Sequence, residues 1–315
     1  MYDNISNFGE GVDNAFVFIF TIILIFFVGI TITLIYFIYK YKFNENRKAL
    51  QIHGSVKLEI IWTVIPIILV LGMFYYGWKG WAPMFRSAPD DAMEIETISR
   101  MWSWNFTYEN GRSTDTLYVP LEKPVKLNLK SMDVIHSLYI PAFRMKQDIV
   151  PGRDDVSMWF IPQKTGTYDL YCTEYCGLRH SYMYTAVVVM EPDQFEKWYE
   201  DTTMQQMQAA ASPAQAGLQI MRQLGCIACH SLDGSRLVGP TYKGLWGKEE
   251  TVITNGEERD IVVNEEYIIR SIYEPNADVV EGFNPGLMQS YENQITEEEM
   301  DKIIEYFKSL SQEGS

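Results

Sequence analysis

Residues 171–183 read YCTEYCGLRHSYM, and this stretch determines how the rest of the chain is interpreted. It contains two Cys, one His and one Met at spacings of four, four and three residues, which could form one face of a helix. The flanking segments 168–171 and 184–190 are rich in Tyr, Thr and Val, and Gly177 lies between them. Such flanks are typical of strands, so we expect a loop that joins two strands.

The side chains of this stretch predict a metal centre. Together with a His 36 positions upstream of the first Cys, they offer two thiolates, two imidazoles and one thioether. Sulfur with imidazole favours copper over magnesium, calcium or manganese, and a second Cys would let two thiolates bridge two copper ions. A Cys2His2 zinc site would use the same four residues and is the alternative. The candidate ligands are His136, Cys172, Cys176, His180 and Met183.

The sequence around this stretch predicts an all-β domain. From about residue 93 to 191, short runs rich in Val, Ile, Tyr and Trp alternate with Pro and Gly, and we expect strands at 116–119, 125–129, 157–161 and 185–190. A sandwich of about 100 residues is typical of this pattern.

A second chemical motif follows a small-residue linker. Cys226-Ile-Ala-Cys229-His230 is the signature of covalent haem attachment, in which two thiols bind the haem and the adjacent His ligates its iron. CxxC alone also occurs in redox and zinc sites. The following His and the segment GPTYKGLWG at 239–247, as in small class I cytochromes c, favour haem.

The second axial ligand of such a haem has two candidates, Met288 and Met300. Met300 falls in a predicted last helix, capped by Thr296 and Glu299, where it should pack. Met288 lies in a Pro- and Gly-rich loop and is the predicted ligand, although Gln289 follows it where related cytochromes usually have Pro. Methionine ligation raises the haem potential.

Two uncharged apolar runs, 15–39 and 60–78, are long enough to cross a bilayer, with buried core helices as the alternative. The loop between them carries Lys40, Lys42, Arg47, Lys48 and Lys57 against a single Glu, whereas the N-terminal tail is acidic. Positive loops stay inside, so we expect both termini and the soluble domains on the outer face of a bacterial inner membrane.

Length and charge limit the remaining possibilities. The chain has 315 residues, a net charge of −15 and only four Cys and four His. The acidic balance argues against nucleic acid as a partner. We expect a transmembrane helical hairpin at 1–92, the β-domain at 93–200, a linker at 201–214 and an all-α cytochrome domain at 215–315.

The chain resembles a known family in three segments: DVIHSL at 133–138, KQDIVPGR at 146–153, and residues 171–183. They are similar to the CuA domain of subunit II of haem–copper cytochrome c oxidases, and the added haem motif resembles the cytochrome-c-fused, caa-type branch. The resemblance implies a cupredoxin-like sandwich with a dinuclear copper (CuA). It also implies that Glu174 ligates copper through its backbone carbonyl and shares a magnesium ion with the catalytic subunit. Asp133 is expected to orient the site from outside the ligand shell.

Two further residues take candidate roles from the resemblance. Trp102, in the aromatic segment 100–108, matches the residue that receives electrons from the donor; core packing is the alternative. Glu59 matches a carboxylate linked to proton uptake, and an ionisable residue at a membrane edge is a functional candidate by default. A solvated surface carboxylate is the alternative for Glu59.

The resemblance implies an electron-transfer subunit of an oxidoreductase. Electrons from cytochrome c or a similar small donor would pass through haem c and CuA to subunit I, which reduces O2 to water with proton translocation. A nitrous oxide reductase would need a second, His-rich copper cluster, which four His cannot supply. A membrane-anchored copper carrier and a quinol-oxidase subunit are further alternatives; quinol oxidases lack these copper ligands.

Overall fold

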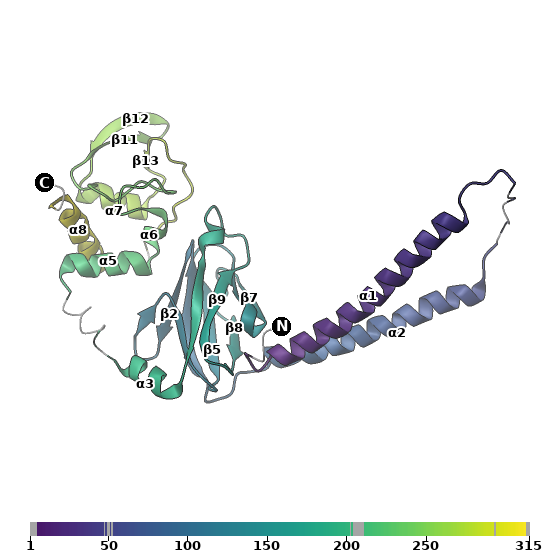
Figure 1. Ribbon diagram of the computed structural model, residues 1–315. Helices are drawn as coiled ribbons and strands as arrows, with labels where there is room; N and C mark the ends of the chain where they lie inside the picture. The colour runs from purple at the N-terminus through teal and green to yellow at the C-terminus, as the bar shows by residue number, and fades with distance from the viewer. Residues whose placement is uncertain are drawn as a thin grey trace.

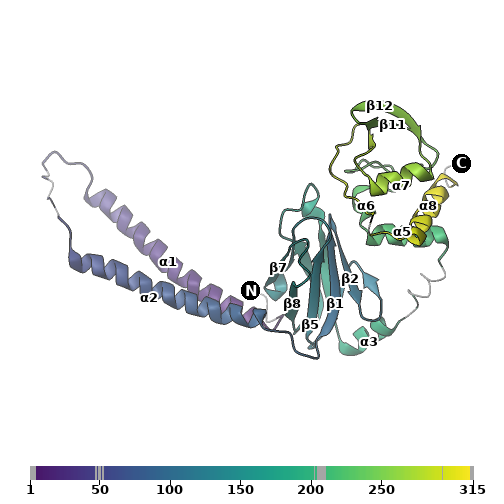
Figure 2. The same ribbon diagram turned by 180° about the vertical axis from the view of Figure 1, so that it is seen from behind.

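The computed structural model describes residues 5–46, 48, 51, 53–201, 203, 211–292 and 294–312. The chain forms a pair of long helices, a β-sandwich and a mostly helical C-terminal domain (Figure 1). The helix pair and the C-terminal domain lie on different sides of the sandwich in both views (Figures 1 and 2). The sandwich therefore connects the apolar helices to the C-terminal domain.

The two N-terminal helices are longer than the predicted spans. Helix α1 covers Gly9–Lys40 and α2 covers Val56–Trp81, followed by the 3-10 helix η1, Ala82–Phe85. Both are long and apolar enough to cross a membrane, and the apolar window of each is 0% buried within the described residues, which argues against core helices. Residue Arg47 of the connecting loop lies outside the described residues.

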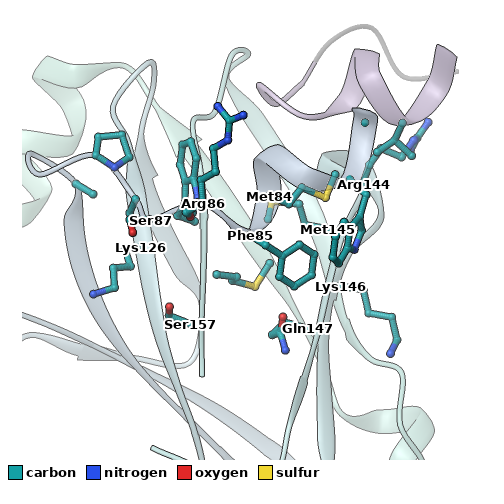
Figure 3. A pocket seen from close by; sticks show the side chains of 18 of the residues that line it. Met84, Phe85, Arg86, Ser87, Lys126, Arg144, Met145, Lys146, Gln147 and Ser157 are labelled. Atoms are coloured by element: carbon teal, nitrogen blue, oxygen red, sulfur yellow. Dashed lines mark hydrogen bonds between the residues drawn. The ribbon is translucent and has the colours of Figure 1, made fainter. Parts of the chain in front are cut away.

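A cavity of about 960 Å³ opens where the end of α2 meets the sandwich. Figure 3 shows Met84 and Phe85 within it and Lys146 at its rim. Arg144, on the sandwich side, donates from Nε to Oδ1 of Asp13 in α1 at 2.7 Å. This ion pair ties the first helix to the sandwich.

The sandwich consists of two five-stranded sheets, in the orders β3-β2-β1-β5-β8 and β4-β10-β9-β6-β7. Buried and half-exposed side chains alternate along strands such as β5, as a two-layer sandwich requires. The predicted all-β domain is confirmed. Its strands are β1 (Met93–Arg100), β2 (Ser103–Tyr108), β3 (Ser113–Thr114), β4 (Leu117–Pro120), β5 (Val125–Ser131), β6 (His136–Ile140), β7 (Met145–Ile149), β8 (Ser157–Phe160), β9 (Gly166–Cys172) and β10 (Tyr184–Met190). Short 3-10 helices are η2 (Pro141–Phe143) and η3 (His180–Tyr182).

The chain just before α1 also belongs to the sandwich. Ile5 and Phe8 are buried in its core, and Ser6 donates from Oγ to the carbonyl of Phe143 at 2.8 Å. After β10, helix α3 (Pro192–Glu200) packs Phe195 into the same core. Most of the predicted linker, 201–214, lies outside the described residues.

The C-terminal domain is helical as predicted, and it also carries a small antiparallel sheet. Asn255-Gly256 between the strand-like runs 251–254 and 259–263 indicates a hairpin in the sequence, and the structure confirms it, with φ values of 53° and 88° at the two turn residues. A third strand that the sequence did not indicate pairs with this hairpin. The elements are α5 (Pro213–Gln223), α6 (Cys226–Cys229), β11 (Glu249–Thr254), β12 (Glu257–Val262), α7 (Glu265–Tyr273), β13 (Val279–Val280) and α8 (Glu297–Gln312).

The last helix begins as the sequence predicts. The amide of Glu299 donates to Oγ1 of Thr296 at 3.3 Å, and the amide of Thr296 donates to Oε2 of Glu299 at 2.9 Å. This reciprocal pair is a capping box. It fixes the start of α8, which packs against α5.

The contact between α5 and α8 yields a stability prediction. Gly217 of α5 faces α8 so closely that a Cβ there would overlap the carbonyl of Lys302. We expect Gly217→Ala to destabilise the C-terminal domain by about 1–3 kcal/mol because the helices must separate. Thermal unfolding should show this loss, whereas Gln223→Ala, an exposed change in the same helix, should stay within about 0.5 kcal/mol. Equal stability of the two variants would contradict the packing described.

Candidate copper centre and haem pocket

The copper-ligand candidates come from strand ends and from the loop between β9 and β10. His136 begins β6, and Cys172 ends β9. Cys176 and His180 lie in the connection, with His180 in the short helix η3, and Met183 immediately precedes β10. The predicted strand–loop–strand arrangement is confirmed, and the helical alternative is wrong.

The donor atoms converge on one point. The ligand atoms of His136, Cys172 and Cys176 all lie within 4.8 Å of one another, and the two sulfurs are 3.8 Å apart. Nδ1 of His136 lies 3.8 Å from the Cys172 sulfur, while Nδ1 of His180 lies 3.5 Å from the Cys176 sulfur. The Met183 sulfur is 3.8 Å from that of Cys176. One imidazole therefore stands beside each thiol, which fits two metal ions bridged by sulfur.

The two thiols are buried and interact strongly. The hydrogen bond between the Cys172 and Cys176 sulfurs lowers the pKa of Cys172 despite burial, and a hydrogen bond with His136 lowers it further. The same contact, together with burial, raises the pKa of Cys176. The pair thus releases one proton easily and the second with difficulty. Bound cations would supply the charge needed to hold both as thiolates.

Asp133 holds the ring of His136. Its Oδ1 lies 2.7 Å from Nε2 of His136, so Nδ1 is the nitrogen that faces the sulfurs. Burial alone would lower the pKa of His136, but hydrogen bonds with Asp133 and Cys172 outweigh it and raise the pKa. Asp133 also accepts the amide of Met101 through Oδ2 at 2.6 Å. A carboxylate behind a metal-facing imidazole is a typical outer-shell arrangement.

The remaining sequence candidates occupy different surroundings. The carbonyl oxygen of Glu174 lies 3.3 Å from the Cys172 sulfur, and its side chain is exposed. Trp102 is only 6% exposed and donates from Nε1 to the carbonyl of Cys176 at 3.1 Å. Glu59 is exposed in the first turn of α2, far along the chain from the metal candidates. The structure thus brings Glu174 and Trp102 to the copper loop.

The haem candidates line one cavity of the C-terminal domain. Cys226, Cys229, His230 and Met288 all face it, and both cysteines are free thiols. Burial raises the pKa of Cys226 to about 12 and that of Cys229 to about 11, so both remain protonated at neutral pH. Met300 instead packs in the core, at 4% exposure. Two free thiols, an imidazole and a thioether on one cavity fit a covalently attached haem.

His230 is fixed by residues whose role the sequence did not reveal. Its Nδ1 lies 2.7 Å from the carbonyl oxygen of Pro240, which leaves Nε2 as the nitrogen for a metal. The ring of Tyr242 stacks on it at 4.5 Å, and a Cβ at Gly239 would overlap it. Burial lowers the pKa of His230, which favours the neutral, metal-binding form. The sequence marked residues 239–247 as typical of small cytochromes c. It could not show that Gly239, Pro240 and Tyr242 of this segment contact His230.

Comparison with known proteins divides the chain in the same way. Residues 1–77 match the family described as cytochrome c oxidase subunit II, transmembrane domain, and residues 112–190 match its periplasmic domain. Residues 214–311 match cytochrome c. Together with the two apolar helices, these matches make the chain a membrane protein with a periplasmic-type domain.

Individual relatives agree with these matches. Cytochrome c oxidase subunit 2 of Alkalihalophilus pseudofirmus is 30% identical over 276 residues, 82% of this chain and 75% of the relative. That of Bacillus sp. (strain PS3) is 28% identical over 293 residues, 85% of this chain and 78% of the relative. A solved periplasmic domain of subunit II from Bradyrhizobium japonicum has a TM-score of 0.35 and 28% identity, covering 38% of this chain and 99% of that one. The similarity to the Alkalihalophilus protein extends over most of both chains. It shows that this chain, with its fused cytochrome c domain, belongs to the cytochrome c oxidase subunit 2 family and is a subunit of a haem–copper oxidoreductase complex.

Proposed function

We propose that this chain is the electron-entry subunit of a terminal oxidase with two cofactors of its own. In this proposal, electrons from cytochrome c or a similar small donor pass by way of haem c and CuA to the haem–copper subunit I. That subunit reduces O2 to water, coupled to proton translocation. The observation that carries the proposal is the convergence of His136, Cys172, Cys176, His180 and Met183 on one point.

The protein residues would hold the cofactors in fixed geometry. Bound copper and haem would supply one-electron redox couples, and the protein would supply ligation, distance and burial. Cys172, Cys176, His136 and His180 would hold the copper ions through their sulfur and imidazole groups. His136 and Cys172 lie at strand ends, which limits their rearrangement when the charge of the site changes. Cys226 and Cys229 would attach the haem, and His230 and Met288 would ligate its iron.

The surface around the copper loop supports contact with another subunit. Tyr175, Leu178 and Tyr182 of this loop are 72%, 63% and 65% exposed, and Ile135, which precedes the candidate ligand His136 in the chain, is 44% exposed. An apolar patch of this kind marks a protein interface. The exposed carboxylate of Glu174 projects from the same loop and would share a magnesium ion with subunit I. Glu59 would serve proton uptake in the same partner.

The charges flanking the helices support an orientation with both termini outside a bacterial inner membrane. Lys40 ends the first helix, Lys42 follows it, and Lys57 lies in the first turn of the second helix, all on the side of the connecting loop. Basic loops remain on the cytoplasmic side. The two soluble domains would then face the periplasmic or extracellular side, where a soluble donor can reach them.

Purification of the tagged full-length chain from its native membrane tests the proposal. We expect a large polytopic haem protein to co-purify and the complex to oxidise reduced cytochrome c with uptake of O2. A membrane-anchored copper carrier would instead purify without that partner, and the purified protein would show no O2 uptake. Isolation of the chain alone, carrying zinc in place of copper, would overturn the proposal.

Asp133 provides a prediction for the copper site. Asp133→Asn removes the negative charge behind His136. It also replaces one carboxylate oxygen with an amide nitrogen, so either His136 or the Met101 amide loses its acceptor. We expect copper affinity to fall about 10–100-fold, as for other outer-shell groups. Competition with a copper chelator measures the change.

The matched control for this prediction is Asp155→Asn. Asp155 is an exposed carboxylate on the same domain, paired only with the exposed Arg153 among the described contacts. Its replacement should leave copper affinity unchanged. Equal affinities for both variants would show that Asp133 does not support the copper ligand.

A further inference from the structure

The copper and haem sites lie in two domains that touch directly. Cys229 and Val238 of the cytochrome domain pack against the hydrophobic core of the sandwich. Met101 and Asp133 of the sandwich line the same cavity as the haem candidates. Gly225 comes so close that a Cβ on it would lie 2.8 Å from Oγ of Ser103. The sandwich therefore forms one wall of the haem pocket.

Two arginines of the sandwich bridge to the cytochrome domain. Arg100 donates from Nη1 to Oε1 of Gln294 at 2.7 Å, and its guanidinium lies 5.9 Å from the ring centre of Tyr291. Arg179 donates from Nη1 to the carbonyl oxygen of Ala228. The first bridge reaches the segment before α8, and the second reaches the haem-attachment segment itself.

The Arg179 contact joins the two candidate cofactor loops. In sequence, Arg179 lies between Cys176 and His180, while Ala228 lies between Cys226 and Cys229. The Arg179 guanidinium lies 5.3 Å from the ring centre of Tyr182, which supports it from its own loop. No carboxylate among the described residues lies within ion-pair distance of Arg179, and its guanidinium donates to the Ala228 carbonyl instead. Hydrogen bonds from charged donors are about twice as strong as neutral ones.

We propose that Arg179 is a positioning residue that holds the haem-attachment segment against the copper-ligand loop, and so sets the distance for electron transfer within the chain. This inference rests on the proposed function for its redox consequence. The docking role stands on the contacts alone. A carbonyl acceptor suits this purpose because it carries the contact through backbone next to Cys229, and does not depend on a mobile side chain.

The test compares Arg179→Ala with the wild type in the full-length, cofactor-loaded chain. Hydrogen exchange of the backbone amides at 226–230 should become about tenfold faster, because loss of a charged hydrogen bond opens the interface more often. After rapid reduction of the haem, electron transfer to copper should slow. The optical spectrum of the haem and the EPR spectrum of the copper should not change.

Two further variants make the outcome decisive. Arg153→Ala removes an exposed arginine elsewhere on the same domain and should leave both measurements at wild-type values. Arg179→Lys keeps a charged donor and should restore part of the exchange protection. Unchanged exchange and an unchanged transfer rate in Arg179→Ala would overturn the inference while leaving the proposed function intact. Absence of copper or haem from the wild type would instead refute the proposed function, and exchange would still test the docking role.

Discussion

Replacing Cys176 with Ser is expected to reduce electron flow from cytochrome c to oxygen by about 100-fold or more. Loss of an outer-shell partner alone costs 10–100-fold in metal sites, and this change removes a ligand shared by two metal ions. The Cys176 sulfur is within 3.8 Å of the Cys172 and Met183 sulfurs and 3.5 Å of His180, so three candidate ligands lose their common neighbour. Copper content, EPR and oxygen uptake measure the effect.

The matched control for Cys176→Ser is Thr173→Ala in the same loop. The Thr173 side chain is exposed, and the backbone amide of Thr173, which the substitution leaves in place, donates to the carbonyl of Ser137 at 3.0 Å. Oxygen uptake by this variant should equal that of the wild type. A Cys176→Ser protein that retained its copper and its turnover would refute the bridged site.

Replacing Met288 with His should lower the potential of the haem by on the order of 100 mV, because a thioether ligand favours the reduced iron more than imidazole does. For one electron, 59 mV corresponds to a tenfold change in the equilibrium constant. The equilibrium between donor and haem should then shift against haem reduction by about 50-fold. A redox titration of the haem band measures the shift.

The second methionine serves as the control for this experiment. Met300→Leu changes a buried residue of the core, at 4% exposure, that does not line the haem cavity. We expect it to cost less than about 1.5 kcal/mol and to leave the potential unchanged. A shift in Met300→Leu with none in Met288→His would assign the axial ligand to Met300.

The sequence predicted well what depends on local spacing. The loop between β9 and β10, the hairpin at Asn255 and Gly256, and the capping box at Thr296 each involve residues within a few positions of one another. Turn preferences, strand patterning and metal-ligand chemistry act over this range, so the pattern of residue types was sufficient.

What the sequence could not predict depends on contacts between distant segments. Ile5 and Phe8 lie just before an apolar helix and gave no sign that they complete the core of the sandwich. Trp102 lies 74 positions from Cys176 but donates to its carbonyl, and Arg179 reaches Ala228 from another domain. Such pairings follow from the packing of whole elements, which no local pattern encodes.

The central claim is that two cysteines of one loop hold two copper ions as a single redox unit in the same chain as a covalent haem. Metal analysis with EPR spectroscopy of the purified full-length protein tests it most directly. The account predicts two coppers and one haem per chain, with an EPR signal of one electron shared equally by both coppers. A single isolated copper, or zinc in a protein without that signal, would contradict it.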